Sequence, residues 1–111
     1  MPDPRAALIY CPFPDTETAR NIARALLDEG LIACANLLGD VEALFIWEGA
    51  QNSATEVAAL FKTTDARMEA VVSRIGALHP YETPAIVASI CEAAHPETLK
   101  WLIHQTGVAN K

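Results

Sequence analysis

Cys11 and His79 carry the side chains that could act together as a nucleophile and its base. A catalytic thiol needs a third group that orients the base, and no Asn or Asp stands out in that role. The sequence also has no Gly-x-Gly-x-x-Gly motif, no phosphate-binding loop and no His-Glu-x-x-His motif. We therefore expect that the protein is not an enzyme.

The three cysteines are an odd number, lie far apart in the chain and include no Cys-x-x-Cys motif. A disulfide framework is not expected from this pattern, and reduced thiols in the cytoplasm fit it better. Cys34 and Cys91 lie inside apolar runs, which favours a place in the core. His95 and His104 have no metal-binding partner four residues away, which favours surface roles.

The composition limits the classes of partner. The chain has 111 residues and a net charge of −6, and its basic residues are scattered singly. This length fits a single domain over residues 1–111, and the acidic balance argues against nucleic acid and anionic membrane as partners. The apolar stretch at 31–38 is too short to span a bilayer, and residues 1–5 lack the pattern of a secretory signal. We expect a cytoplasmic protein.

Apolar periodicity and end signals predict the elements that must position these side chains. Asp15 begins a first helix, whose apolar residues follow helical spacing up to a stop at Gly30. Strands are expected at 6–11, 31–38, 41–47, 56–63 and 85–94, with a bend at 39–40 and a polar loop at 49–55. A second helix follows the capping cluster at 63–65 and ends before Pro80, and a short terminal helix begins at Pro96.

This order of elements matches the α+β class. It is the ferredoxin-like split β-α-β plan, with an antiparallel sheet, helices on one face, an extended bent hairpin and a short C-terminal helix.

The stretch 41–47 is apolar on both of its faces. Ala43, Phe45 and Trp47 lie on one face of the expected strand, and Leu44 and Ile46 lie on the other. An antiparallel sheet with one solvated face should alternate apolar with polar residues. A partner subunit would cover the second face; packing under the terminal helix is the alternative.

Four segments together resemble the divalent-cation tolerance (CutA) family. They are IACAN at 32–36, FIWEG at 45–49, EV at 56–57 with KTT at 62–64, and HPYETP at 79–84. They lie in the family's order and with similar spacing, and the resemblance extends from about Leu8 to Leu102. It implies a homotrimer of ferredoxin-like subunits joined through long strands into intermolecular sheets. It also implies binding of copper or other divalent cations and a part in metal tolerance.

The resemblance further implies copper ligands at Cys11 and His79, while the position of a second histidine in the family is Leu78 here. A thiolate and an imidazole suit copper, zinc or another divalent transition metal better than magnesium or calcium. The alternative is structural: Cys11 as a small buried apolar residue and His79 as a cation at a helix C-terminus.

Trp47, Glu56, Lys62, Tyr81 and Glu82 also match family motifs. They are expected either to line a cleft between subunits, where concave sites often form, or to form an interfacial ion-pair network that fixes register.

Two functions therefore stay open. The first is a trimeric protein that binds copper or another divalent cation. The second is a trimeric interaction or signalling scaffold that binds a small regulator in its inter-subunit clefts without a physiological metal.

Overall fold

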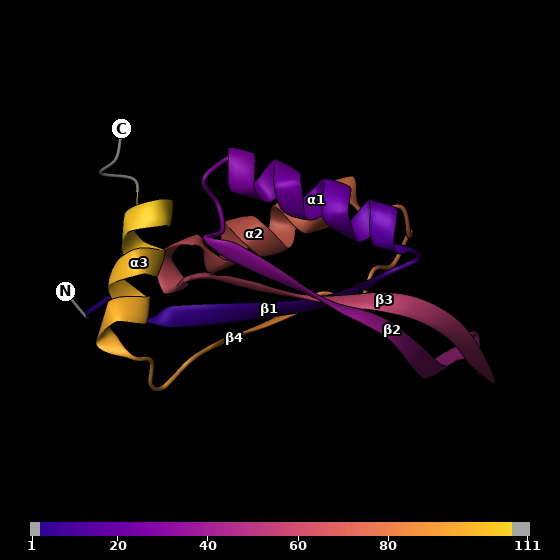
Figure 1. The fold of residues 1–111 in the computed structure, drawn as a ribbon. Helices are drawn as coiled ribbons and strands as arrows, with labels where there is room; N and C mark the ends of the chain where they lie inside the picture. The colour runs from indigo at the N-terminus through magenta and orange to yellow at the C-terminus, as the bar shows by residue number, and fades with distance from the viewer. Residues whose placement is uncertain (1–2, 108–111) are drawn as a thin grey trace.

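The computed structural model describes residues 3–107. The elements follow the order β1 (Ala6–Phe13), α1 (Thr16–Asp28), β2 (Cys34–Trp47), β3 (Ala50–Thr64), α2 (Asp65–Leu78), β4 (Val87–Ile90) and α3 (Pro96–Thr106). The strands form one antiparallel sheet in the spatial order β2-β3-β1-β4. Helices α1 and α2 lie on one face of it, and α3 stands at one end (Figure 1). The predicted ferredoxin-like α+β class is confirmed. The prediction of one domain over 1–111 reaches beyond the described residues. The expectation about a secretory signal, made from residues 1–5, also includes residues outside the described range.

The first helix forms for the reasons that its sequence suggests. The carboxylate of Asp15 accepts a hydrogen bond from the backbone N–H of Thr18 at 2.8 Å, which caps the helix and lowers the pKa of Asp15. At the other end, Gly30 has a φ of 71°, a value that suits glycine. The buried residues of α1 are Ala19, Ile22, Ala23 and Leu26.

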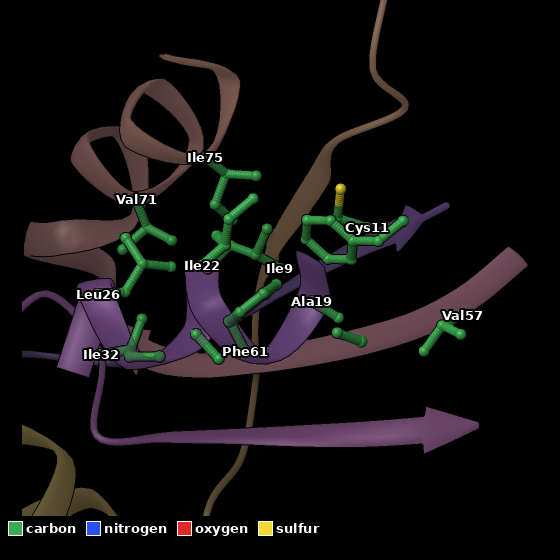
Figure 2. Close-up of a cluster of buried hydrophobic side chains, with 13 residues drawn as sticks. Ile9, Cys11, Ala19, Ile22, Leu26, Ile32, Val57, Phe61, Val71 and Ile75 are labelled. Atoms are coloured by element: carbon green, nitrogen blue, oxygen red, sulfur yellow. The ribbon is translucent and has the colours of Figure 1, made fainter. Parts of the chain in front are cut away.

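The core lies between the sheet and helices α1 and α2. Ile9 and Phe61 from the strands meet Leu26, Val71 and Ile75 from the helices, and all five side chains are fully buried (Figure 2). Burying an aliphatic or aromatic side chain of this size contributes roughly 1.5–3 kcal/mol. The core therefore fixes the helices on one face of the sheet.

The polar loop predicted at 49–55 is wrong, because this segment is the first part of β3. Residues 50–55 pair with β2, from Trp47 opposite Ala50 to Glu42 opposite Thr55. Only Glu48 and Gly49 form the turn, and both have positive φ (51° and 81°), as a two-residue type I′ hairpin requires. The segment does not alternate apolar with polar residues because all of residues 50–55 are exposed, so the sequence pattern does not indicate a strand.

The two strands predicted at 31–38 and 41–47 are one continuous strand with a bulge. Leu37 is paired with Ala59 and Gly39 with Ala58, so Leu38 is the extra residue. Gly39 has a φ of 92°, which places the predicted bend at the bulge. Beyond it the hairpin curves away past the end of the helical layer (Figure 1). The radius of gyration is accordingly 14.8 Å, against about 13 Å for a compact domain of this length.

Strand β4 is shorter than the predicted 85–94. It pairs with β1 only from Ala7 to Tyr10. Pro12 follows in β1 and has no N–H to continue the ladder. At the other end of the sheet the terminal helix α3 packs against β3, where the Thr106 hydroxyl lies 3.5 Å from the Thr64 hydroxyl. The terminal helix therefore does not cover the hairpin.

Candidate functional site

The face of the sheet opposite α1 and α2 carries many apolar side chains. Among the helices of residues 3–107, α3 packs on this face only at its end, near Thr64, and the part toward the hairpin has no helix over it (Figure 1). Tyr10 is paired with Leu60 in β3 and with Val87 in β4, so these side chains share this face. Val41 is paired with Glu56 and continues the face onto β2. Below we call this surface the open face, and in β2 it comprises Val41, Ala43, Phe45 and Trp47.

The hairpin is exposed on both of its sides. Trp47 on the open face is 48% exposed, and Leu44 on the opposite face is 76% exposed. The alternation of faces predicted for 41–47 thus holds in β2, and the alternative of packing under the terminal helix does not.

A pocket of about 590 Å³ lies where the open face curves into the hairpin. Four aromatic side chains contribute to its lining: Tyr10, Phe45, Trp47 and Tyr81. Three acidic residues also line it: Glu42, Glu56 and Glu82. The pocket therefore combines an apolar, aromatic lining with acidic groups.

Glu56 is the buried acid of this pocket, and only 8% of it is exposed. The phenol of Tyr81 donates a hydrogen bond of 2.8 Å to its Oε2. Burial and this bond to the carboxylate raise the pKa of Tyr81 to about 12. The Tyr81 hydroxyl therefore keeps its hydrogen and holds the Glu56 carboxylate at the pocket wall.

His79 is held by hydrogen bonds at both ring nitrogens. The backbone N–H of Tyr81 donates to Nδ1 at 3.1 Å, which assigns the ring hydrogen to Nε2, and Nε2 donates to the carbonyl of Pro12 at 2.9 Å. The ring stacks on Phe13, with centroids 4.9 Å apart, and contacts the Tyr81 ring at 4.7 Å. Only 7% of His79 is exposed, so the imidazole has no lone pair available in this arrangement.

Cys11 lies fully buried at the edge of the core (Figure 2). Its thiol makes a weak hydrogen bond of 3.4 Å to the same Pro12 carbonyl that His79 contacts. Burial first, and the nearby Glu56 charge second, raise the pKa of Cys11 from 9.0 to about 12. The thiol is therefore protonated at neutral pH, which is the wrong form for a nucleophile or a metal ligand.

The two predicted ligands converge on one carbonyl oxygen, but as they lie they do not fit a metal ion. Among residues 3–107, no three His, Cys, Asp or Glu side chains gather in a group that could hold one. Leu78, at the end of α2, supplies no donor. The assignment of Cys11 and His79 as ligands stays a prediction.

Of the five predicted cleft or interface residues, the structure brings four into one pocket: Trp47, Glu56, Tyr81 and Glu82. Lys62 is on the same strand and face as Glu56 but six residues further on, roughly 20 Å away at about 3.3 Å per residue. Sequence reasoning missed Tyr10 and Glu42 as part of the pocket. Tyr10 reaches the pocket through the register of β1 against β3, which no local motif encodes.

Comparison with known proteins identifies the family. Residues 7–105 match the family described as "CutA1 divalent ion tolerance protein". The chain belongs to this family. The predicted resemblance to the CutA family is therefore confirmed.

Individual relatives agree over nearly the whole chain. A divalent-cation tolerance protein CutA from Pyrococcus horikoshii is 41% identical over 99 residues, which cover 89% of this chain and 96% of the relative. The crystal structure of the CutA1 protein from Ehrlichia chaffeensis superposes with a TM-score of 0.88 at 33% identity, covering 94% of this chain and 97% of that one. A CutA structure from Archaeoglobus fulgidus, described as periplasmic, gives 0.87 at 35% identity, covering 91% and 98%.

Within residues 3–107, no helix is long and apolar enough to cross a membrane.

Proposed function

We propose that this member of the divalent ion tolerance family acts as a cytoplasmic homotrimer without catalytic activity. The observation that carries the proposal is the uncovered open face together with the exposed hairpin. A contiguous apolar surface of this kind marks an interface between proteins, and a second and third copy of the chain supply cover of matching chemistry. The number three comes from the family resemblance. The described cysteines are all free, which supports a reducing compartment.

The cation that the proposal assigns to Cys11 and His79 is copper or another divalent transition metal. Binding there would require the thiol to lose its proton and His79 to give up at least one of its two hydrogen bonds. Both costs reduce affinity, and the loss of the thiol proton makes binding weaken as pH falls. We expect weak binding, with copper above zinc and both far above magnesium.

Calorimetric titration with copper under reducing conditions tests this assignment. Cys11→Ser and His79→Ala should each weaken binding, and Leu78→His should tighten it by adding a donor at the end of α2. Glu69→Gln, an exposed change on α2, is the control and should have no effect. Unchanged affinity in both Cys11→Ser and His79→Ala would reject the copper site.

A second function is favoured by the pocket on the open face. Its volume of about 590 Å³ lies within the range of roughly 300–1,000 Å³ typical of small-molecule sites. In a trimer it would become a cleft between subunits, where a small regulator could bind without a metal. A screen for small molecules that raise the melting temperature of the trimer tests this function.

A further inference from the structure

The pocket on the open face has acidic groups without basic ones. Glu42, Glu56 and Glu82 line it, and no lysine or arginine of the described residues does. The side-chain ion pairs found among residues 3–107 are Arg74 with Glu29 and Lys100 with Glu97. Glu56 therefore lacks a cationic partner within the described part of its own chain.

Glu56 is also the most costly place for an unpaired charge. It is nearly buried, and the hydrogen-bond partner of its side chain among residues 3–107 is the neutral phenol of Tyr81. A buried carboxylate is stabilised by a positive charge within contact distance and is costly without one. The charge of Glu56 thus favours a positively charged occupant.

The aromatic side chains of the pocket favour the same charge. Tyr10, Phe45, Trp47 and Tyr81 all line it, and the faces of aromatic rings attract cations. They also provide apolar contact for the body that carries the charge. A strongly hydrated bare metal ion would gain little from such a lining.

The hydrogen bonds specify the kind of cation. The Tyr81 hydroxyl uses its hydrogen on Glu56 Oε2, so both the phenol oxygen and the carboxylate offer only acceptors to an occupant. A primary ammonium group can donate to both of them, and a quaternary ammonium group cannot. We infer that the pocket binds a small molecule with a primary ammonium group on an aromatic or otherwise apolar body. This inference rests on the second function proposed above, the binding of a small regulator.

Calorimetric titration of the full-length protein with 2-phenylethylammonium tests the inference. It should bind at least about tenfold more tightly than 2-phenylethanol, which lacks the charge, and than 3-phenylpropionate, which reverses it. Benzyltrimethylammonium, which keeps the charge without an N–H donor, should also bind more weakly. In a Trp101→Phe background, the emission of Trp47 reports whether the amine enters this pocket.

Two matched variants locate the charge that is recognised. Glu56→Gln keeps the shape and an acceptor for Tyr81 but removes the charge, and it should weaken amine binding at least about tenfold. Glu69→Gln removes an exposed charge on α2 and should leave binding unchanged. Native mass spectrometry on each variant shows whether its assembly is intact.

Three outcomes would overturn the inference, and they bear differently on the parent function. If 2-phenylethanol or 3-phenylpropionate binds more tightly than 2-phenylethylammonium, the pocket does not select an ammonium group, but it is still a pocket for a small regulator. Absence of binding by all four probes would remove support from the regulator pocket as well. If the amine does not bind and Glu56→Gln dissociates the trimer, the cation is a side chain of a second copy, such as its Lys62.

Discussion

At the residue scale, the turn after α2 positions the side chains whose types could do chemistry. His79 binds the Pro12 carbonyl, and Tyr81 two residues later binds Glu56. Through these two bonds the turn joins the end of β1 to β3. The same packing keeps Cys11 buried and protonated, so residues whose types suggest chemistry have structural partners instead.

The raised pKa of Cys11 predicts a loss of stability at high pH. In the unfolded chain the thiol ionises near pH 9.0, and in the folded protein near pH 12. Between these values the unfolded state releases a proton that the folded state keeps, so the free energy of unfolding falls as pH rises. The slope from this group is at most about 1.4 kcal/mol per pH unit. The contribution is fully present below pH 9.

Urea unfolding from pH 8 to pH 11, on the wild type and on Cys11→Ala, measures this effect. Cys11→Ala should reduce the slope of the free energy of unfolding against pH, while Cys34→Ala should keep the slope of the wild type. Equal slopes in wild type and Cys11→Ala would show that Cys11 ionises normally in the folded protein.

Cys11 should also be catalytically silent. Its thiol is protonated at neutral pH, and His79 directs its Nε2 hydrogen at Pro12 and so cannot act as a base toward Cys11. No turnover of a thioester or peptide substrate is expected. Turnover that is lost in Cys11→Ser would contradict this prediction.

The sequence singled out Cys11, His79, Glu56 and Tyr81 by their types and motifs, but it did not reveal their partners. The Pro12 carbonyl is a backbone atom, and backbone acceptors leave no mark in a sequence. The bond between Glu56 and Tyr81 joins residues 25 positions apart, and it depends on the path of the turn after α2.

At the element scale, the long β2–β3 hairpin is the feature that distinguishes this fold from a minimal ferredoxin-like domain. Helix ends and the core stripes of α1 were predictable because capping and helical periodicity are local. The outer half of β3 was not, because residues 50–55 are exposed on both faces and pair only through their backbone. Its strand conformation depends on β2 lying beside it, which is a tertiary effect.

The hairpin turn gives a direct test of this element. Gly49→Ala places a Cβ on a residue with a φ of 81° and should lower the free energy of unfolding by about 1–2 kcal/mol. Gly76→Ala is the matched control: it lies within α2, its new Cβ would meet Ile86 Cδ1 at an ordinary 3.8 Å, and it should stabilise by about 0.5–1 kcal/mol. Urea unfolding measures both, and a neutral Gly49→Ala would contradict the turn assigned here.

At the scale of the whole molecule, the subunit is a two-layer domain with an apolar third side. Its principal extents of 46 × 26 × 21 Å reflect the hairpin that extends past the helices. A two-stranded ribbon is only marginally stable by itself in water, so the outer hairpin needs a further surface to pack on. The sequence predicted this requirement from the two apolar faces of residues 41–47, but it could not show that the pocket lies on the open face.

Placing a charge on the open face should separate the subunits. Trp47 is 48% exposed in the single chain and lies outside the core cluster, so Trp47→Asp leaves the core of the subunit intact. In the trimer it would bury an unpaired carboxylate, at a cost of several kcal/mol. Size-exclusion chromatography with light scattering should show smaller species, and circular dichroism should show a retained fold. Leu27→Asp on α1, at 44% exposure, is the control and should keep the assembly of the wild type.

The trimer itself is tested most directly by native mass spectrometry of the wild-type protein at low micromolar concentration. The uncovered open face and the exposed hairpin predict that the trimer is the dominant species. A spectrum dominated by the monomer would mean that these surfaces remain in water, and it would contradict the proposed assembly.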